Sequence, residues 1–273
     1  MPGEKPVAVI TGASAGIGAA LADVFADNGH AIVLVARRAP QLEVLADAIQ
    51  QRGHARPHVI VLDLGQPGAA ARLDDNLRAN GLEPQFLINN AGFGLMGPAA
   101  RLDRAQQLAM IDLNVRVLTE LSLRFAASLV RHRGGILNVA SVASFLPGPG
   151  MAVYHATKAY VLSFSEALHR ELGSDGVRVT ALCPGPVETE FMARAGIPEN
   201  HFPHFMSRTP GRVAQEGYDG LIRGRRVVIP GTNNKLAALL ARLLPRRLVL
   251  WLFRIFARTD FSKDCTSHPR RSD

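Results

Sequence analysis

The chain has 273 residues, of which 47% are hydrophobic and 20% are charged, and its formal net charge is +8. This length suits one large α/β domain, and the ordinary apolar fraction excludes a disordered or fibrous chain. The two cysteines, Cys183 and Cys265, are too few for a disulfide framework, and no Cys/His cluster has the spacing of a metal site.

The positive charge is confined to one part of the chain. Residues 1–203 carry 17 Lys and Arg against 18 Asp and Glu, whereas residues 204–273 carry 14 against 5. A basic end on a neutral body argues against nucleic-acid binding and favours a local contact with anionic lipid or an acidic partner. Because the chain shows no signal-peptide profile and no apolar run long enough to span a bilayer, we expect a cytoplasmic protein.

Short Val- and Ile-rich runs alternate with longer segments of helical period. The apolar runs lie at 7–10, 31–36, 58–62, 86–88, 135–140, 177–183 and 226–229. The helical segments lie at 17–28, 41–52, 68–80, 103–131, 152–172 and 212–223. This alternation predicts a doubly wound α/β sandwich with a mainly parallel seven-stranded sheet and helices on both faces. Ligands of such sheets bind in the loops at the carboxyl ends of the strands.

The first strand leads directly into 11-TGASAGIG-18 and then into a helix. Gly12, Gly16 and Gly18 would let the backbone turn sharply and approach a pyrophosphate at the helix N-terminus. A tight strand–helix turn without a ligand is the structural alternative. The strand–loop–helix context favours nucleotide binding.

Two arginines follow the second strand. An NAD-specific site would place an acidic residue there, but this chain has Ala36 followed by Arg37 and Arg38. Because guanidinium groups bind phosphate in a bidentate manner, the arrangement predicts selection of NADP(H). Two solvated arginines at the start of a helix are the structural alternative.

The segment 152–172 carries Tyr154 and Lys158 on one helical face, at a spacing of four residues. A free phenol has a pKa of about 10, and a nearby ammonium should lower the pKa of Tyr154. Ser141 lies at the end of the preceding strand, where its hydroxyl could stabilise charge on a substrate oxygen. Without such partners, the Tyr/Lys pair would only indicate an exposed helix face.

The Gly-x-x-x-Gly-x-Gly spacing, together with Ser141 and the Tyr154-x-x-x-Lys158 pair, resembles the short-chain dehydrogenase/reductase family over about residues 5–230. The resemblance implies a Rossmann-type fold, a homodimer or homotetramer, and metal-free hydride transfer between NADP(H) and a carbonyl or secondary alcohol. Tyr154 would then be the acid/base, Ser141 would polarise the carbonyl, and Lys158 would bind ribose and lower the phenol pKa. Asn114, in 112-DLNVRV-117, would hold a water in a proton relay.

The same resemblance implies further cofactor contacts. Asp63 and Leu64 would border the adenine, 89-NNAG-92 would line the cleft, and Val187 and Thr189 would meet the carboxamide of the nicotinamide. The predicted cofactor site comprises Gly12, Ser14, Gly16, Ile17, Gly18, Arg37, Arg38, Asp63, Leu64, Asn90, Ala91, Gly92, Tyr154, Lys158, Pro184, Gly185, Val187 and Thr189.

The region after Thr189 corresponds to the substrate lid of that family, at about 190–210. Its apolar residues indicate an adaptable pocket wall, although they could equally pack the lid on the body: Phe191, Met192, Phe202, Phe205 and Met206. We expect a catalytic domain over 1–232, an amphipathic helical extension over 233–265 and a disordered tail over 266–273.

Segment 246–258 is amphipathic if it is helical, with arginines on one side and Leu248, Trp251, Leu252, Ile255 and Phe256 on the other. It could lie peripherally in a membrane interface, cap the cleft or form a subunit contact.

The sequence therefore predicts an NADP(H)-dependent oxidoreductase for an apolar, lipid-like carbonyl or alcohol. A non-catalytic NADP-binding regulator of the same fold is the first alternative. An epimerase or dehydratase of the extended branch is the second, although such enzymes carry a longer substrate domain.

Overall fold

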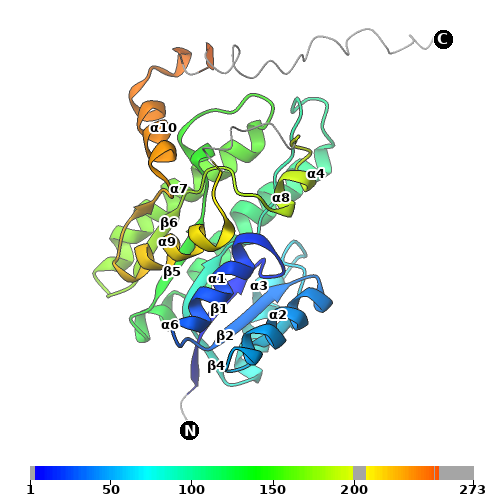
Figure 1. The fold of residues 1–273 in the computed structure, drawn as a ribbon, viewed down its shortest axis with the longest axis vertical. Coiled ribbons are helices and arrows are strands. Elements are labelled where there is room, and N and C mark those ends of the chain that lie inside the picture. Colours follow the sequence, from blue (N-terminus) through cyan, green and yellow to red (C-terminus); the bar gives the residue numbers. More distant parts are fainter. Residues whose placement is uncertain (1–3, 199–206, 249, 252–273) are drawn as a thin grey trace, which may run out of the picture.

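The computed structural model describes residues 4–198, 207–248 and 250–251, and these form a three-layer α/β sandwich (Figure 1). Its central sheet has seven strands in the order β3-β2-β1-β4-β5-β6-β7. Every neighbouring pair in the sheet is parallel. The predicted doubly wound Rossmann-type fold is therefore confirmed.

The strands are short and largely buried: β1 (Lys5–Thr11), β2 (Ile32–Ala36), β3 (His58–Val61), β4 (Leu82–Asn89), β5 (Gly135–Val139), β6 (Arg178–Leu182) and β7 (Val227–Val228). The chain winds outward from β1 to β3, returns to β4 beside β1, and then winds the other way. Ile10 of β1 is in register with Ile88 of β4. The order of the strands reverses between β1 and β4, and a cleft forms at their carboxyl ends for this reason.

The helices cover both faces of the sheet: α1 (Gly16–Asp27), α2 (Ala39–Gln51), α3 (Ala69–Ala79), α4 (Arg104–Ile111), α5 (Leu118–Arg124), α6 (Ala126–Arg131), α7 (Ala152–Gly173), α8 (Glu190–Arg194), α9 (Pro210–Ile222) and α10 (Thr232–Leu243). A π-helical turn, η1 (Asp112–Val117), joins α4 to α5, and a short 3₁₀ turn, η2 (Val142–Phe145), precedes α7.

Two apolar cores lie on opposite faces of the sheet because successive strand residues point to opposite sides. Ala8 and Ile10 of β1 pack with residues of α1, α2 and α9. Val7 and Val9 pack with residues of α3, α5, α6 and α7. This two-sided burial explains why the strands read as nearly continuous apolar runs.

The single helix predicted over 103–131 is wrong. The π-helical turn at Asp112–Val117 interrupts it, and the chain breaks again at Phe125, whose φ of −92° and ψ of 2° are not helical. A π turn widens the helix locally and often accompanies a functional position. Here it contains Asn114, whose side chain bonds to the loop after β4.

The part of the chain after β7 is helical as far as it is described. Helix α10 ends before Pro245, and residues 246–248 and 250–251 are helical again. The rest of the predicted amphipathic segment, 252–258, and the predicted tail, 266–273, lie outside the described residues. None of the described helices is long and apolar enough to cross a bilayer.

Candidate active site

A cavity of about 900 Å³ lies at the carboxyl ends of the strands, between the loops that follow neighbouring strands β1 and β4. The loops after β1, β2, β3, β4, β5 and β6 all contribute to its lining. Most of the residues predicted to bind a cofactor line this cavity. Gly18 and Asn114 do not line it and lie behind its wall.

The backbone conformation of the loop after β1 requires glycine at the positions where the chain turns. Gly12 and Gly16 have φ values of 65° and 58°, in the left-handed region that favours glycine. A Cβ on Gly18 would collide with the carbonyl oxygen of Gly12. The loop therefore brings the free N–H groups at the start of α1 to the cavity, which is the arrangement that binds a pyrophosphate.

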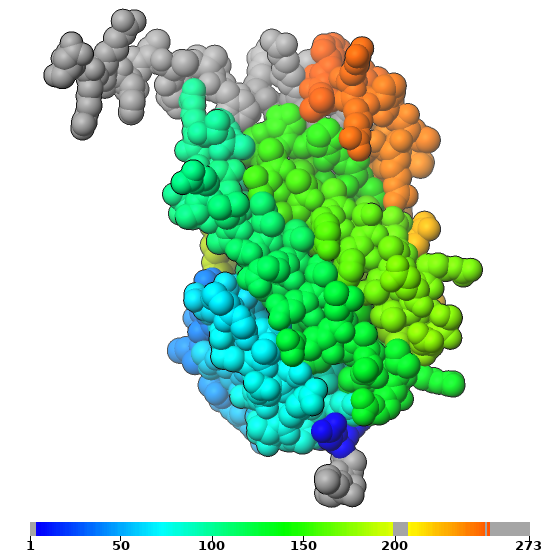
Figure 2. Space-filling model, turned by 180° about the vertical axis from the view of Figure 1, so that it is seen from behind, coloured from blue at the N-terminus to red at the C-terminus, as the bar shows by residue number. Residues whose placement is uncertain are grey.

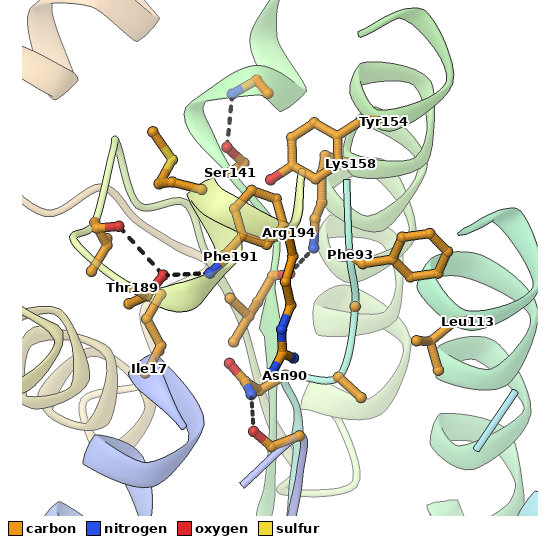
Figure 3. A pocket seen from close by; sticks show the side chains of 18 of the residues that line it. Ile17, Asn90, Phe93, Leu113, Ser141, Tyr154, Lys158, Thr189, Phe191 and Arg194 are labelled. Atoms are coloured by element: carbon orange, nitrogen blue, oxygen red, sulfur yellow. Dashed lines mark hydrogen bonds between the residues drawn. The ribbon is translucent and has the colours of Figure 1, made fainter. Parts of the chain in front are cut away.

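Thr11 and Asn90 connect this loop to the loop after β4. The Asn90 side-chain amide donates to the carbonyl oxygens of Thr11 at 2.9 Å and of Gly12 at 3.1 Å (Figure 3). The Thr11 hydroxyl accepts from the backbone N–H groups of Asn90 and Ala91, both at 3.0 Å. Sequence reasoning placed Asn90 at the cleft but missed Thr11, for which the only signal was its position immediately before the first glycine.

Both arginines after β2 line the cavity. Arg38 donates to the Ser14 hydroxyl of the glycine loop at 3.1 and 3.2 Å, and it forms an ion pair of 2.9 Å with Glu190 of α8. Glu190 also pairs with Arg194 one turn further along α8. Sequence reasoning missed Glu190 and Arg194, because no local pattern shows that α8 approaches the end of β2.

Asp63 and Leu64 also line the cavity. The Asp63 carboxylate accepts from the backbone N–H of Gly65 at 3.0 Å, so it stabilises the turn after β3. Pro184, Gly185, Val187 and Thr189 form the opposite wall. The Thr189 hydroxyl caps the start of α8, and a Cβ on Gly16 would lie 3.0 Å from the Thr189 methyl group. The glycine loop and the segment after β6 are therefore in direct contact.

Ser141, Tyr154 and Lys158 come together at one end of the cavity (Figure 3). The Ser141 hydroxyl lies beside the Tyr154 phenol (Figure 3). The Ser141 oxygen also accepts from the backbone N–H of Ala143 at 3.1 Å. The Lys158 ammonium donates to the carbonyl oxygen of Val139 at 2.7 Å and lies 5.8 Å from the centre of the Tyr154 ring. By contrast, Ser144 bonds to the backbone of α7 and takes no part in this cluster.

The protonation of this cluster differs from the expectation for Tyr154. Burial raises the pKa of the Tyr154 phenol to about 12, although the nearby Ser141 hydroxyl acts in the opposite direction. Burial lowers the pKa of the Lys158 ammonium to about 8. The pKa of Tyr154 is therefore not lowered as predicted. Desolvation of the phenol has the larger effect, and the Lys158 ammonium donates to the carbonyl oxygen of Val139. At neutral pH Tyr154 therefore carries its proton.

Asn114 holds the loop after β4 against α7. Its side-chain oxygen accepts from the backbone N–H of Phe93 at 3.1 Å, and its nitrogen donates to the Phe93 carbonyl at 2.9 Å and to Thr157 at 3.1 Å. A Cβ on Gly92 would lie 2.8 Å from the Asn114 oxygen and 3.7 Å from the Lys158 nitrogen. Glycine at position 92 therefore leaves a narrow gap between Asn114 and Lys158.

Apolar side chains also line the cavity, and among them Phe191 lies beside Tyr154: Leu95, Met96, Leu113, Leu146, Met151, Phe191, Met192 and Ile197. The rings of Tyr154 and Phe191 lie 5.5 Å apart. Two residues of the predicted apolar wall, Phe191 and Met192, are thus present, whereas Phe202, Phe205 and Met206 lie outside the described residues. Among the residues that are described, no group of three or more His, Cys, Asp and Glu is placed to hold a metal.

Comparison with known proteins matches residues 6–199 to the family described as short chain dehydrogenase. Sulfoacetaldehyde reductase 2 of Chromohalobacter salexigens is 39% identical over 194 residues, which cover 70% of this chain and 76% of that protein. A short-chain dehydrogenase from Sphingobium yanoikuyae in complex with NADPH has a TM-score of 0.77 and 32% identity, and the match covers 98% of this chain and 100% of that one.

A bulky-bulky ketone specific alcohol dehydrogenase from Comamonas testosteroni has a TM-score of 0.72 and 30% identity, with 97% of each chain covered. The sequence match and the structural likeness cover the sheet, the glycine loop and the Ser141, Tyr154 and Lys158 cluster. The chain therefore belongs to the short-chain dehydrogenase/reductase family, and it is an oxidoreductase of alcohols and carbonyl compounds that uses a nicotinamide cofactor.

Proposed function

We propose that the protein is an NADP(H)-dependent carbonyl reductase that interconverts ketones or aldehydes with alcohols on apolar substrates. The main support for this proposal is that the side chains of Ser141, Tyr154 and Lys158 line the same cavity. The neighbouring hydroxyls of Ser141 and Tyr154 and the buried Lys158 line this cavity together with the glycine loop and apolar side chains.

Tyr154 and Ser141 act on the substrate oxygen. A bound nicotinamide supplies or accepts the hydride at the substrate carbon. In the direction of reduction, the neutral Tyr154 phenol donates its proton to the carbonyl oxygen as charge develops there. Ser141 has one O–H donor, and its oxygen already accepts from Ala143. Its proton is therefore available for the substrate oxygen.

Lys158 supports Tyr154 and holds the ribose. An ammonium has three N–H donors, and one of them is directed at the Val139 carbonyl. The two others remain for the ribose hydroxyls and for the phenolate that Tyr154 becomes after proton transfer. The charge of Lys158 stabilises this phenolate, so its effect on the pKa of Tyr154 belongs to the reacting complex.

Arg37 and Arg38 support the preference for NADP(H). Both line the cavity beyond the glycine loop, where the 2′-phosphate of a bound cofactor would lie. Arg38 is oriented by Ser14 and Glu190, and the residues that directly follow β2 in the chain are basic, not acidic. The related Sphingobium protein, which was solved with NADPH, adds support.

The apolar wall supports a substrate with bulky apolar groups on the carbonyl. Leu95, Met151, Phe191 and Met192 surround the space beyond Tyr154, and unbranched Met side chains can adapt to different shapes. The relative that is specific for bulky-bulky ketones supports the same substrate class.

The proposal is tested with ketones, aldehydes and alcohols of graded chain length, followed by NADPH absorbance and repeated with NADH. We expect turnover that rises with apolar chain length and a clear preference for NADPH. The Tyr154→Phe variant should lose turnover by several orders of magnitude and still bind NADPH. If the wild-type protein binds NADPH but turns over none of these compounds, a non-catalytic role replaces the proposed one.

A further inference from the structure

Helix α10 (Thr232–Leu243) places its small residues inward and its large apolar residues outward. The inner side is buried or half-buried: Asn234, Ala237, Ala238 and Ala241. The outer leucines are exposed: Leu236 at 57%, Leu239 at 52%, Leu240 at 46% and Leu243 at 71%. A surface helix ordinarily buries its leucines, so this orientation leaves an apolar stripe unpaired in the described structure.

The stripe is continuous. At about 100° per residue, the four leucines fall within an arc of about 100°, roughly opposite the three alanines. Beyond Pro245, the exposed apolar residues continue with Leu248, Leu250 and Trp251. A contiguous exposed apolar patch of this kind marks a surface that contacts a partner or a membrane.

The basic residues in the same segment favour an anionic partner for the stripe. From Thr232 to Trp251 the chain contains no acidic residue but has four Lys and Arg: Lys235, Arg242, Arg246 and Arg247. Of these, Arg242 lies 3.9 Å from Glu166 of α7. Lys235, Arg246 and Arg247 are exposed. A second copy of the same face would place these cations against like charges, whereas anionic lipid offers both negative headgroups and an apolar interior.

The inner side of α10 belongs to the active-site cavity. Ala237 and Ala238 line the cavity, and the side chain of Asn234 packs so closely on Gly185 that a Cβ there would collide with it. The Asn234 amide also donates to the Pro230 carbonyl at 2.8 Å. In both views α10 lies at the edge of the molecule (Figures 1 and 2), and Figure 1 shows it on the side of the carboxyl ends of the strands. One helix therefore joins the leucine stripe to the wall of the cavity.

We propose that α10 and residues 246–248 and 250–251 dock the protein on an anionic lipid surface, with the leucine stripe among the acyl chains and the basic residues at the headgroups. Docking through this helix places the cavity beside the membrane, where apolar substrates concentrate. The docking itself does not depend on the proposed chemistry, and the experiment below contains no substrate.

Trp251 is the only tryptophan of the chain, so its fluorescence reports directly on this surface. The full-length protein is titrated with phosphatidylcholine vesicles that contain or lack phosphatidylglycerol, and binding is also measured by co-sedimentation. We expect a blue shift of Trp251 emission and sedimentation with the anionic vesicles, both weakened by added salt. Binding that is equally strong without phosphatidylglycerol, or absent from both vesicles, overturns the proposal.

Two double variants separate the apolar and electrostatic contributions. Leu239→Ser with Leu243→Ser should weaken vesicle binding by at least about tenfold. Arg246→Gln with Arg247→Gln should weaken it by roughly 30-fold at low salt. Both variants remove exposed side chains, so the thermal unfolding midpoint should stay close to that of the wild type.

Each double variant has a control of equal chemistry elsewhere on the surface. Val44 on α2 and Leu123 on α5 are 69% and 60% exposed, and Val44→Ser with Leu123→Ser should bind as the wild type does. Arg131→Gln with Arg133→Gln removes the same charge just before β5, at the opposite end of the strands. Equal losses in test and control variants would contradict docking through α10.

A second copy of the chain is the competing occupant of the stripe. Dimerisation through the stripe predicts a blue shift of Trp251 emission when the protein concentration is raised without lipid. It also predicts a doubled mass by light scattering, which the Leu239→Ser, Leu243→Ser variant should abolish. That pair of results would replace the membrane proposal with a dimer interface.

Discussion

The Glu190 carboxylate lies 2.9 Å from the Arg38 guanidinium, and the pair joins α8 to the end of β2 across the rim of the cavity. Glu190 also pairs with Arg194, so one carboxylate bridges two guanidinium groups. A phosphate also binds arginine through charge-assisted hydrogen bonds, which can be bidentate. The 2′-phosphate of NADP(H) would therefore compete with Glu190 for Arg38.

Replacing Arg38 by alanine should weaken NADPH binding about 10- to 100-fold, because a charge-assisted contact to the phosphate is lost. NADH binding should change little, since NADH has no phosphate at that position. The dissociation constants are measured by the fluorescence of the bound reduced cofactors. Arg52→Ala, which removes an arginine paired with Asp23 elsewhere on the surface, is the control and should alter neither constant. Equal weakening for both cofactors would argue against a phosphate contact.

Replacing Glu190 by glutamine should tighten NADPH binding a few-fold, because the variant keeps the side-chain size and removes the competing negative charge. The effect is small because Arg38 and Glu190 are 28% and 54% exposed, where solvent screens ion pairs. NADH affinity should be unchanged. Weaker NADPH binding in this variant would show instead that Glu190 orients Arg38 for the phosphate.

Lys158 should reduce the stability of the folded protein at neutral pH. Burial lowers its pKa from 10.5 to about 8, so between these pH values the unfolded chain binds more protons than the folded one. The free energy of unfolding should therefore rise with pH from about 8 to about 10.5 because of this group. The raised pKa of Tyr154 acts in the opposite direction, from about 10 to about 12.

The Lys158→Met variant tests whether the buried ammonium lowers the free energy of unfolding at neutral pH. At pH 7 it should be more stable than the wild type by roughly 1–2 kcal/mol, the removed charge penalty being partly offset by the lost hydrogen bond to Val139. The difference should shrink as the pH rises above about 8, and turnover should be lost at every pH. Urea unfolding of both proteins at several pH values measures the difference in their free energies of unfolding. A variant that is less stable at pH 7 would contradict a net cost of the buried ammonium.

Adding one methyl group at Gly92 should impair catalysis. A Cβ there would press on the Asn114 oxygen and extend towards the Lys158 nitrogen. We expect Gly92→Ala to lower kcat about 10- to 100-fold, since small misplacements of reacting groups are costly. Steady-state kinetics measures this. Gly173→Ala is the control, because a Cβ at Gly173 meets no atom within 4 Å. Unchanged kcat in Gly92→Ala would show that the gap between Asn114 and Lys158 has no role.

Much of the architecture could be predicted because it follows from local patterns. Apolar strands that alternate with helices require a parallel sheet covered on both faces, and the fold was predicted correctly on this basis. The family was predicted correctly from the glycine spacing and the Ser141, Tyr154 and Lys158 pattern. The break in the helix over 103–131 could not be predicted. The π turn there contains Asn114, whose partner Phe93 lies 21 residues away in the chain, and no local pattern shows that contact.

The sequence by itself determined the fold class, the family and the loops that reach the cavity, because periodicity and the glycine and Tyr/Lys spacings are local properties of the chain. Only the tertiary structure decided that Glu190 faces Arg38, that burial raises the pKa of Tyr154 and that the leucines of α10 point outward. Ion pairing, desolvation and burial depend on which distant segments become neighbours, and packing alone sets those neighbours.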